Sequence, residues 1–180
     1  MTRAFLILDL THDVANREGR FGKLHGTAEH AHSREVPAKL VAAADAARAA
    51  GDRIVWVFPS DELFTSNGYP ASDEWGGAVD EEYGRPLPSE LVIWKTDIDA
   101  FVDTPLGDAL RASDVHEVVL AGIATTHVVS ATARGAVARG YRTVVAADGC
   151  ADHSEAVHRA ALSNLPPEVV VTELAEIWGS

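Results

Sequence analysis

The fold of this chain is decided by residues 118–140, which read VVLAGIATTHVVSATARGAVARG. The apolar run at residues 118–121 stops at Gly122, and small residues with helical spacing follow it. We therefore expect a buried strand that turns sharply into a helix. Such a turn lies at the carboxyl end of a strand, where the unpaired N–H groups of the next helix face a crevice and can hold an anion.

Strands and helices alternate along the rest of the chain, as in a parallel sheet with helices on both faces. Residues 4–10 (AFLILDL) are apolar except for Asp9, so we expect a central strand that is buried on both sides and lies beside strand 116–121. Residues 37–50 predict a helix with Pro37 at its first position. The other strands are expected at residues 53–58, 91–94, 116–121, 141–147 and 168–171, and the other helices at 104–112, 126–139, 154–165 and 172–178.

Two segments, residues 11–36 and 59–88, have no clear hydrophobic period. Loops of this length in a compact domain are usually lids or binding loops, and a short helix is expected within the second, at residues 73–83. Trp75 lies in that segment and is a candidate pocket residue. We find no repeat and no composition break, which predicts a single domain over residues 1–180.

Composition narrows the class of protein. The formal net charge of −12 and the lack of a basic stripe argue against a nucleic-acid partner. The single cysteine, Cys150, suits a reducing compartment, and we expect it to be packed and unreactive. The N-terminal apolar run is too short for a signal peptide or a membrane span. These features predict a cytoplasmic protein with no membrane partner.

Residues 122–129 (GIATTHVV) resemble the signature Gly-x-Ala-Thr-x-x-Cys-Val of the isochorismatase-like hydrolases, also called the cysteine hydrolase superfamily. Val128 stands where most members carry the nucleophilic cysteine, so the family's thioester mechanism cannot operate at that position. Isochorismatases also lack this cysteine and cleave a vinyl ether by proton transfer. The resemblance spans residues 5–165. Together with the right-handedness of crossover connections, this resemblance implies an α/β fold. The expected fold is a Rossmann-like three-layer α/β/α sandwich with a six-stranded parallel sheet.

Asp9 and Lys95 are the expected acid–base pair. A carboxylate inside an apolar strand is costly unless it has a partner or a purpose, although capping a nearby loop would also explain it. The resemblance favours catalysis, since residues 8–13 (LDLTHD) keep both aspartates of the family's motif. Residues 95–106 resemble Lys-x-x-x-Ser-Ala-Phe-x-x-Thr-x-Leu, with Asp99 in place of serine. The match identifies Lys95 with the family's catalytic lysine.

The resemblance also implies a cis peptide bond before Ala124 and an oxyanion hole made by the N–H groups of Ala124 and Val128, which survive side-chain replacement. Ala124, Thr125, His127, Phe101 and Trp75 are expected to bind substrate, though packing explains His127 equally well. His30 and His32 are expected in a solvated loop, and residues 58–88 contain no histidine, so no metal and no cofactor are expected.

The sequence thus predicts a small-molecule hydrolase that works without a cysteine, by Asp/Lys acid–base chemistry on a vinyl ether or a related C–O or C–N bond. Two alternatives stay open. One is a catalytically silent member of the fold that binds a ligand or forms oligomers, and the other is an amide hydrolase with an unrecognised nucleophile. A homo-oligomer is expected, because family members commonly assemble and the alanine-rich helix surfaces permit close packing.

Overall fold

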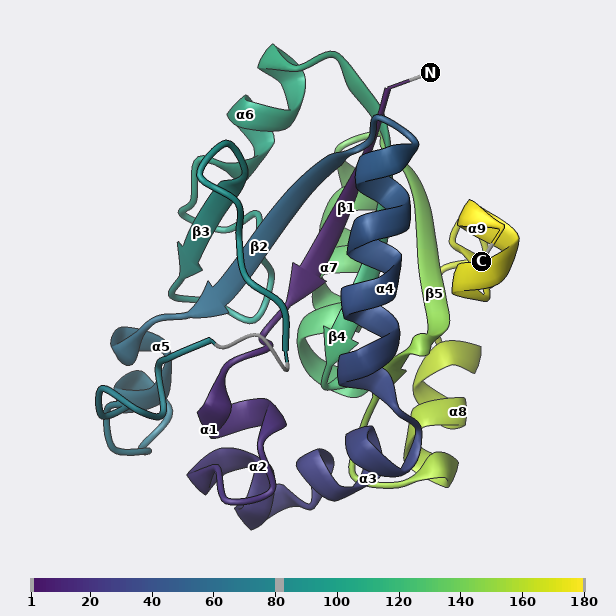
Figure 1. Cartoon of the computed structure of the whole chain (residues 1–180). Coiled ribbons are helices and arrows are strands. Elements are labelled where there is room, and N and C mark those ends of the chain that lie inside the picture. Colours follow the sequence, from purple (N-terminus) through teal and green to yellow (C-terminus); the bar gives the residue numbers. More distant parts are fainter. Residues whose placement is uncertain (1, 80–82, 180) are drawn as a thin grey trace.

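The computed structural model describes residues 2–79 and 83–179, and within them six parallel strands form one sheet in the order β3-β2-β1-β4-β5-β6 (Figure 1). The expected α/β architecture is confirmed. The strands are β1 (Thr2–Leu8), β2 (Arg53–Pro59), β3 (Leu91–Lys95), β4 (Val115–Ile123), β5 (Arg142–Ala151) and β6 (Val170–Thr172).

The two expected central strands, β1 and β4, lie side by side in the middle of the sheet. Every residue of β1 from Ala4 to Leu8 is fully buried, because helices cover both faces of the strand. Leu8 pairs with Gly122 at the carboxyl end of the two strands. The φ angle of Gly122 is +142°, and a Cβ atom there would lie 2.1 Å from the Leu8 carbonyl oxygen, so only glycine fits.

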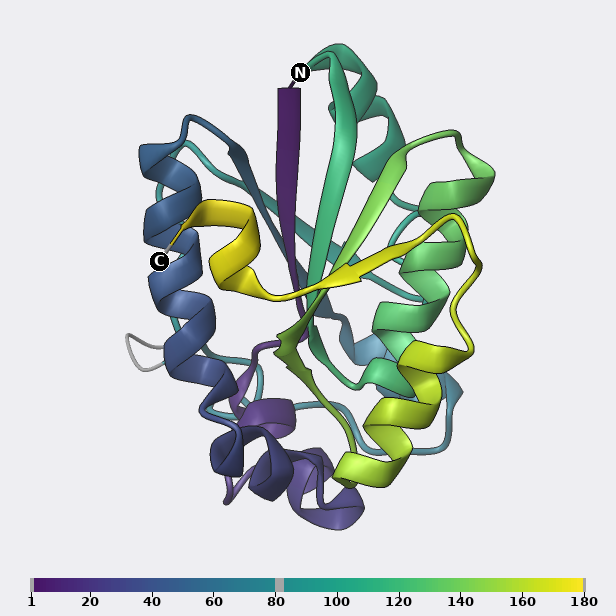
Figure 2. The same ribbon diagram turned by 90° about the vertical axis from the view of Figure 1, so that its right-hand side faces the viewer.

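Helices cover the sheet on both faces, which makes a three-layer sandwich (Figure 2). One layer contains α4 and α9, and the other contains α6, α7 and α8. Helix α4 has Pro37 in its first turn and begins one residue before the expected position. The bounds are α4 (Val36–Ala49), α9 (Leu174–Trp178), α6 (Leu106–Ala112), α7 (Ser130–Ala138) and α8 (Glu155–Ser163).

The segment at residues 11–36 is not irregular, contrary to expectation. It forms three short helices, α1 (His12–Ala15), α2 (Arg20–His25) and α3 (Thr27–Ser33), beyond the carboxyl ends of the strands. Each is too short to show a hydrophobic period, and Gly26, in the left-handed conformation, separates α2 from α3. They lie at the end of the molecule toward which β1 points (Figure 1).

The second long segment also begins with a helix, α5 (Asp61–Ser66), whose N-cap Ser60 accepts a hydrogen bond from the Leu63 N–H. The helix expected at residues 73–83 is not present in the part described, because residues 74–77 form turns and residues 80–82 lie outside the described residues. None of the described helices has the length and hydropathy needed to cross a membrane.

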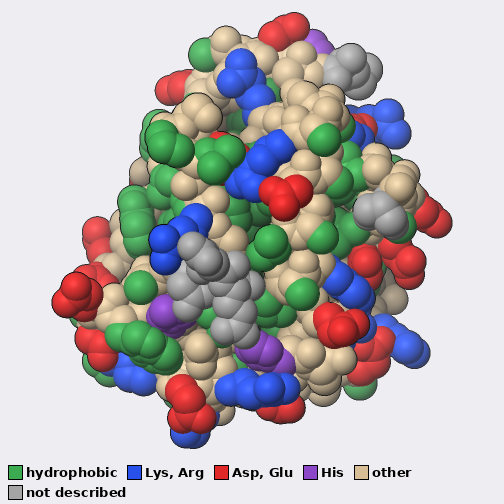
Figure 3. Space-filling view, in the orientation of Figure 1, with side chains coloured by type: hydrophobic (Ala, Val, Ile, Leu, Met, Phe, Trp, Pro, Cys, Tyr) green, Lys and Arg blue, Asp and Glu red, His purple; other side chains and the backbone are tan. Residues whose placement is uncertain are grey.

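Charges are distributed evenly over one face of the molecule. On the face seen in Figure 3, basic and acidic side chains are interspersed, and the basic ones do not gather into a stripe. This face therefore offers no continuous basic surface for a polyanion.

Candidate active site

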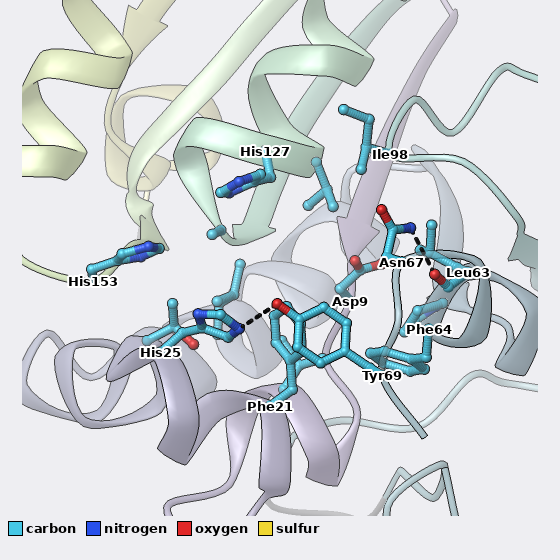
Figure 4. A pocket seen from close by; sticks show the side chains of 16 residues that line it. Asp9, Phe21, His25, Leu63, Phe64, Asn67, Tyr69, Ile98, His127 and His153 are labelled. Carbon is cyan, nitrogen blue, oxygen red and sulfur yellow. Dashed lines mark hydrogen bonds between the residues drawn. The ribbon is translucent and has the colours of Figure 1, made fainter. Parts of the chain in front are cut away.

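A cavity of about 200 Å³ opens at the carboxyl ends of β1 and β4 (Figure 4). Helices α2 and α5 and the turn after β4 enclose this cavity. Residues far apart in the sequence therefore meet there. Most of the lining is apolar, and the polar groups are few and convergent, which is typical of small-molecule sites. The lining residues are Asp9, Val14, Phe21, His25, Thr27, Pro59, Leu63, Phe64, Asn67, Tyr69, Ile98, Ile123, Ala124, His127, Val128 and His153.

Asp9 follows β1 directly, and its side chain pairs with that of Lys95. The Lys95 Nζ lies 3.1 Å from Asp9 Oδ2, and the lysine side chain is fully buried. Lys95 ends β3, beside Pro59 of β2, so its side chain spans the width of β2 to reach Asp9. Only Asp9 of this pair lines the cavity, and its Oδ1 accepts no hydrogen bond from the described residues.

The electrostatics of Asp9 follow from this placement. Burial raises the pKa of the Asp9 carboxyl above its usual value, and the positive charge of Lys95 offsets only part of that effect. The backbone of Asp9 has a positive φ of 59°, and its N–H donates to the Val57 carbonyl at 2.8 Å. The carboxyl group is therefore fixed in place and holds its proton more tightly than an exposed aspartate does.

The turn after β4 differs from the simple strand-to-helix switch expected. Strand β4 continues to Ile123, the Ile123–Ala124 peptide bond is cis, and a π-helical turn, η1 (Thr125–Val129), precedes α7. A π turn bulges the backbone, and such turns are frequent at functional sites. Ala124 and Val128 both line the cavity, so the position at which the sequence resemblance places the nucleophile faces the ligand space although its side chain is apolar.

Thr125 does not line the cavity, although it was expected to bind substrate. Its side chain is fully buried and turned toward β5 and α8, where the hydroxyl lies 3.0 Å from the Ala151 carbonyl and 2.8 Å from His158 Nδ1. Burial, and after it the positive charge of Arg34, lowers the pKa of His158 to about 4, so this imidazole is neutral at neutral pH. Thr125 therefore anchors the turn.

Phe101 is also placed away from the cavity, contrary to expectation. It is buried, stacks on Tyr141 with ring centroids 5.8 Å apart, and lies under the Arg139 guanidinium. Asp99, which stands in place of the serine of the resembled motif, packs against Gly135 and lies 3.8 Å from Arg139. The segment after β3 thus packs on α7.

Trp75 is likewise outside the cavity. It is 45% exposed, its ring lies against His12, and its carbonyl contacts His12 Nδ1 at 2.9 Å. Asp13 holds this segment in place, because its carboxylate binds Arg20 and accepts the Ser72 hydroxyl. Asp13, the second aspartate of the motif at residues 8–13, therefore stabilises the loop that contains Ser72 and Trp75.

Two histidines that were not expected in the site, His25 and His153, line the cavity beside the expected His127. The ring centroids of His153 lie 6.0 Å from those of His25 and 6.2 Å from those of His127. No local motif marks His25 or His153, so only the tertiary structure identifies them. His30 and His32, expected in a solvated loop, are partly buried on α3, where His30 Nδ1 accepts the Asp152 N–H and His32 contacts the Ala15 carbonyl.

Cys150 is fully buried on β5, and burial raises the pKa of its thiol to about 12. A thiol in that state is almost entirely protonated near neutral pH and is a poor nucleophile. It is not among the lining residues of the cavity. The expected packed cysteine is confirmed.

Known proteins resemble this chain in both sequence and structure. The ureidoacrylate amidohydrolase RutB of Methylobacterium radiotolerans is 32% identical over 158 residues, which cover 72% of this chain and 60% of that protein. The streptothricin hydrolase of Streptomyces noursei is 44% identical over 69 residues, 38% of this chain and 27% of that protein. The chain thus spans between about a quarter and three fifths of the length of these curated relatives.

An isochorismatase-like hydrolase from Alkaliphilus metalliredigens has the same fold, with a TM-score of 0.84 and 21% identity over 99% of this chain and 98% of that one. The family model for the isochorismatase domain matches residues 3–176, nearly the whole chain. With the strand order, the Asp9–Lys95 pair and the turn at residues 122–129 in place, this protein belongs to the isochorismatase family.

Proposed function

We propose that the chain hydrolyses a small molecule in this cavity, with Asp9 as the acid–base group and without a covalent enzyme intermediate. One observation carries the proposal: Asp9 is held by Lys95 through Oδ2, while Oδ1, without a hydrogen-bond partner among the described residues, belongs to a group that lines the cavity. A buried carboxylate beside a ligand space, with one oxygen that accepts no hydrogen bond from the described residues, is suited to proton transfer.

The chemistry needs only water. Ionised Asp9 takes a proton from a water molecule as the water oxygen adds to the electrophilic carbon of the substrate. The bond to the leaving group then breaks, and the leaving nitrogen or oxygen receives the proton from Asp9, which returns the carboxylate to its first state. Lys95 stabilises the ionised form of Asp9, and the N–H groups of Ala124 and Val128 would stabilise the negative charge on the substrate oxygen.

A C–N bond of an amide or a ureido group is the first substrate class to test. The two curated relatives are named for hydrolysis of streptothricin and of ureidoacrylate. Both compounds belong in the first substrate panel, together with simple amides and vinyl ethers, which extend the panel to C–O bonds. Product formation is measured by mass spectrometry, and incorporation of ¹⁸O from labelled water confirms that the cleavage is a hydrolysis.

Ligand binding without turnover is the second candidate function. It is favoured by Val128, which gives the cavity an inert side chain at the family's nucleophile position, and by Lys95, which is fully buried behind Asp9. Compounds that bind in the cavity but are never converted, across the whole panel, would favour this candidate over hydrolysis.

Removing the only thiol should leave activity intact. We expect Cys150→Ala to keep the kcat/KM of the parent protein within about threefold, because Cys150 lies outside the cavity and its thiol is protonated. Treatment of the parent protein with iodoacetamide should have equally little effect. Loss of activity in the variant, with an unchanged thermal unfolding curve, would show that the thiol of Cys150 is required and would contradict the proposed chemistry.

A thiol restored at position 128 should be reactive. In Cys150→Ala/Val128→Cys the new sulfur would face the cavity near Asp9, which can accept its proton, so we expect alkylation by iodoacetamide at neutral pH to be faster than that of the same thiol in the unfolded chain. Val129→Cys in the same background is the matched control, because Val129 is fully buried and does not line the cavity. Equal rates for the folded and unfolded Val128→Cys protein would remove Asp9 from its assigned role.

A further inference from the structure

Three histidines form one side of the cavity, opposite Asp9, and we call them the histidine cluster: His25, His127 and His153 (Figure 4). They come from three separate elements. His25 ends α2, His127 lies in η1, and His153 follows β5. The rings of His127 and His153 are nearly parallel, with an interplanar angle of 11°.

Each ring has one nitrogen engaged by the protein and one that makes no hydrogen bond with the described residues. His25 Nε2 lies 3.2 Å from the Tyr69 hydroxyl, and His127 Nδ1 lies 2.9 Å from the Thr126 hydroxyl. His153 Nδ1 lies 2.8 Å from Asp152 Oδ1. The second nitrogen of each ring is thus left for a ligand, so the cluster offers up to three hydrogen-bond donors when protonated.

The Asp152 side chain holds His153 in position. Its side chain is fully buried and accepts hydrogen bonds from the N–H groups of Thr126 and His153, at 2.6 and 2.8 Å. With its Oδ1 atom 2.8 Å from His153 Nδ1, the Asp152 carboxylate fixes the orientation of the imidazole ring. Asp152 therefore acts as a positioning residue for the cluster.

The histidines are also the only lining side chains, among the residues that the structure describes, that can carry a positive charge. The pKa of His25 is lowered first by burial and then by the charges of His153 and His127, so positive charges on these rings repel one another. An anion bound among them would remove that repulsion. The other ionisable groups that face this space are Asp9, which Lys95 compensates, Tyr69, and Asp152 behind His153.

A metal ion fits this arrangement less well than an anion. The rings of His127 and His153 are nearly parallel, with their centroids 6.2 Å apart. Within the described parts of the chain, no three side chains of the kinds that bind metals are grouped as a ligand set. A planar anion needs no common centre, since its oxygens can each accept from a different ring.

We propose that the histidine cluster binds the carboxylate group of a small organic acid, whose apolar body lies along Phe21, Phe64 and Ile98. If this acid is the substrate, the proposal rests on the hydrolysis proposed above. The bound carboxylate would then place the reacting bond at Asp9, on the opposite side of the cavity (Figure 4). The absence of arginine from the lining, with a cavity of about 200 Å³, suits one carboxylate better than a bulkier phosphate.

The test compares phenylacetate with phenylacetamide, which have the same apolar body and differ in charge. Isothermal titration calorimetry at about pH 6, near the ordinary pKa of histidine, should show that the acid binds about tenfold more tightly than the amide, the size of one charge-assisted hydrogen bond. Repeating the titration in two buffers with different ionisation enthalpies should show net proton uptake with the acid but not with the amide.

His127→Gln and His153→Gln should each reduce the preference for the acid to less than about threefold and reduce the proton uptake. His116→Gln is the matched control and should leave both unchanged, because His116 is an exposed histidine beside Asp114 at the far end of β4. An equal affinity for acid and amide, or no binding of either compound, would overturn the proposal.

These outcomes are separable from those of the proposed function. Binding is measured without turnover, and Asp9→Asn should retain or increase the preference for the acid because it removes a negative charge from the cavity. A lost acid preference with intact Asp9-dependent hydrolysis overturns only the carboxylate site. A retained acid preference without any Asp9-dependent hydrolysis overturns only the catalytic role.

Discussion

Asp9→Asn lowers kcat/KM by about 10²- to 10⁴-fold if Asp9 is the acid–base group, which is the usual contribution of a positioned proton-transfer residue. An asparagine of the same shape can still fill the site beside the cavity, but it cannot take a proton from water. Ligand affinity should change much less than kcat. The measurement is steady-state kinetics on the first converted compound of the panel.

Asp99→Asn is the matched control, because Asp99 is also partly buried, burial also raises the pKa of its carboxyl, and it lies outside the cavity. We expect its kcat/KM to stay within about threefold of the parent value. Activity of Asp9→Asn within the same range would contradict the assignment. Since Lys95 loses its counter-charge in Asp9→Asn, the folded fraction must be measured beside the rate.

The pH profile gives a second check on Asp9. A general base acts only when ionised, so kcat/KM should fall as the pH decreases through the pKa of Asp9. Because burial raises that pKa, the midpoint should lie above the usual carboxyl value of 3.8. The acid limb should be absent from the residual activity of Asp9→Asn.

Lys95→Met should lower the free energy of unfolding by about 3–5 kcal/mol near neutral pH, because it leaves the buried Asp9 carboxylate without its counter-charge. The loss should shrink as the pH falls. Asp9 has a raised pKa in the folded protein, so protonation favours the folded state, and the cost of the buried charge returns as the pH rises through that pKa. Urea unfolding at several pH values measures both effects.

Lys23→Met provides the comparison on the surface, where Lys23 pairs with Glu18 and both side chains are well exposed. We expect a change of at most about 1 kcal/mol there. Asp9→Asn/Lys95→Met should be more stable than Lys95→Met alone, since neither buried charge remains. A Lys95→Met protein as stable as Lys23→Met would mean that the ion pair has no role in holding the fold.

The central part of the fold was predictable because its signals are local. The doubly buried run of β1, the glycine stop at Gly122 and the carboxylate inside an apolar strand each follow from a few adjacent residues. The contact between Asp9 and Lys95 was also predictable, since strands of a parallel sheet end at the same edge. The strand bounds differ by only a few residues, as for β6, where the hydrophobic run is short.

The rest of the site depends on contacts that no local pattern encodes. Helices α1 to α3 have four to seven residues each and are stabilised by packing on one another, so they show no period. Thr125 and Phe101 lie next to site residues in sequence, but their side chains point into the neighbouring layers. The three residues of the histidine cluster come from three separate elements. They meet only because the short helices pack over the carboxyl ends of the strands.

The pairing of β1 with β4 joins the two halves of the chain at the centre of the sheet. Thr2 of β1 pairs with Val115 of β4, which follows more than a hundred residues later in the sequence. Strands β1, β2 and β3 are therefore synthesised before β4, the strand that pairs with β1 in the core. Asp9 and Phe64 belong to the early half, and Val128 and His153 to the late one. The site therefore forms only after nearly the whole chain has been synthesised, and an occupant of the cavity would act as a clamp that holds the two halves together against mechanical or thermal separation.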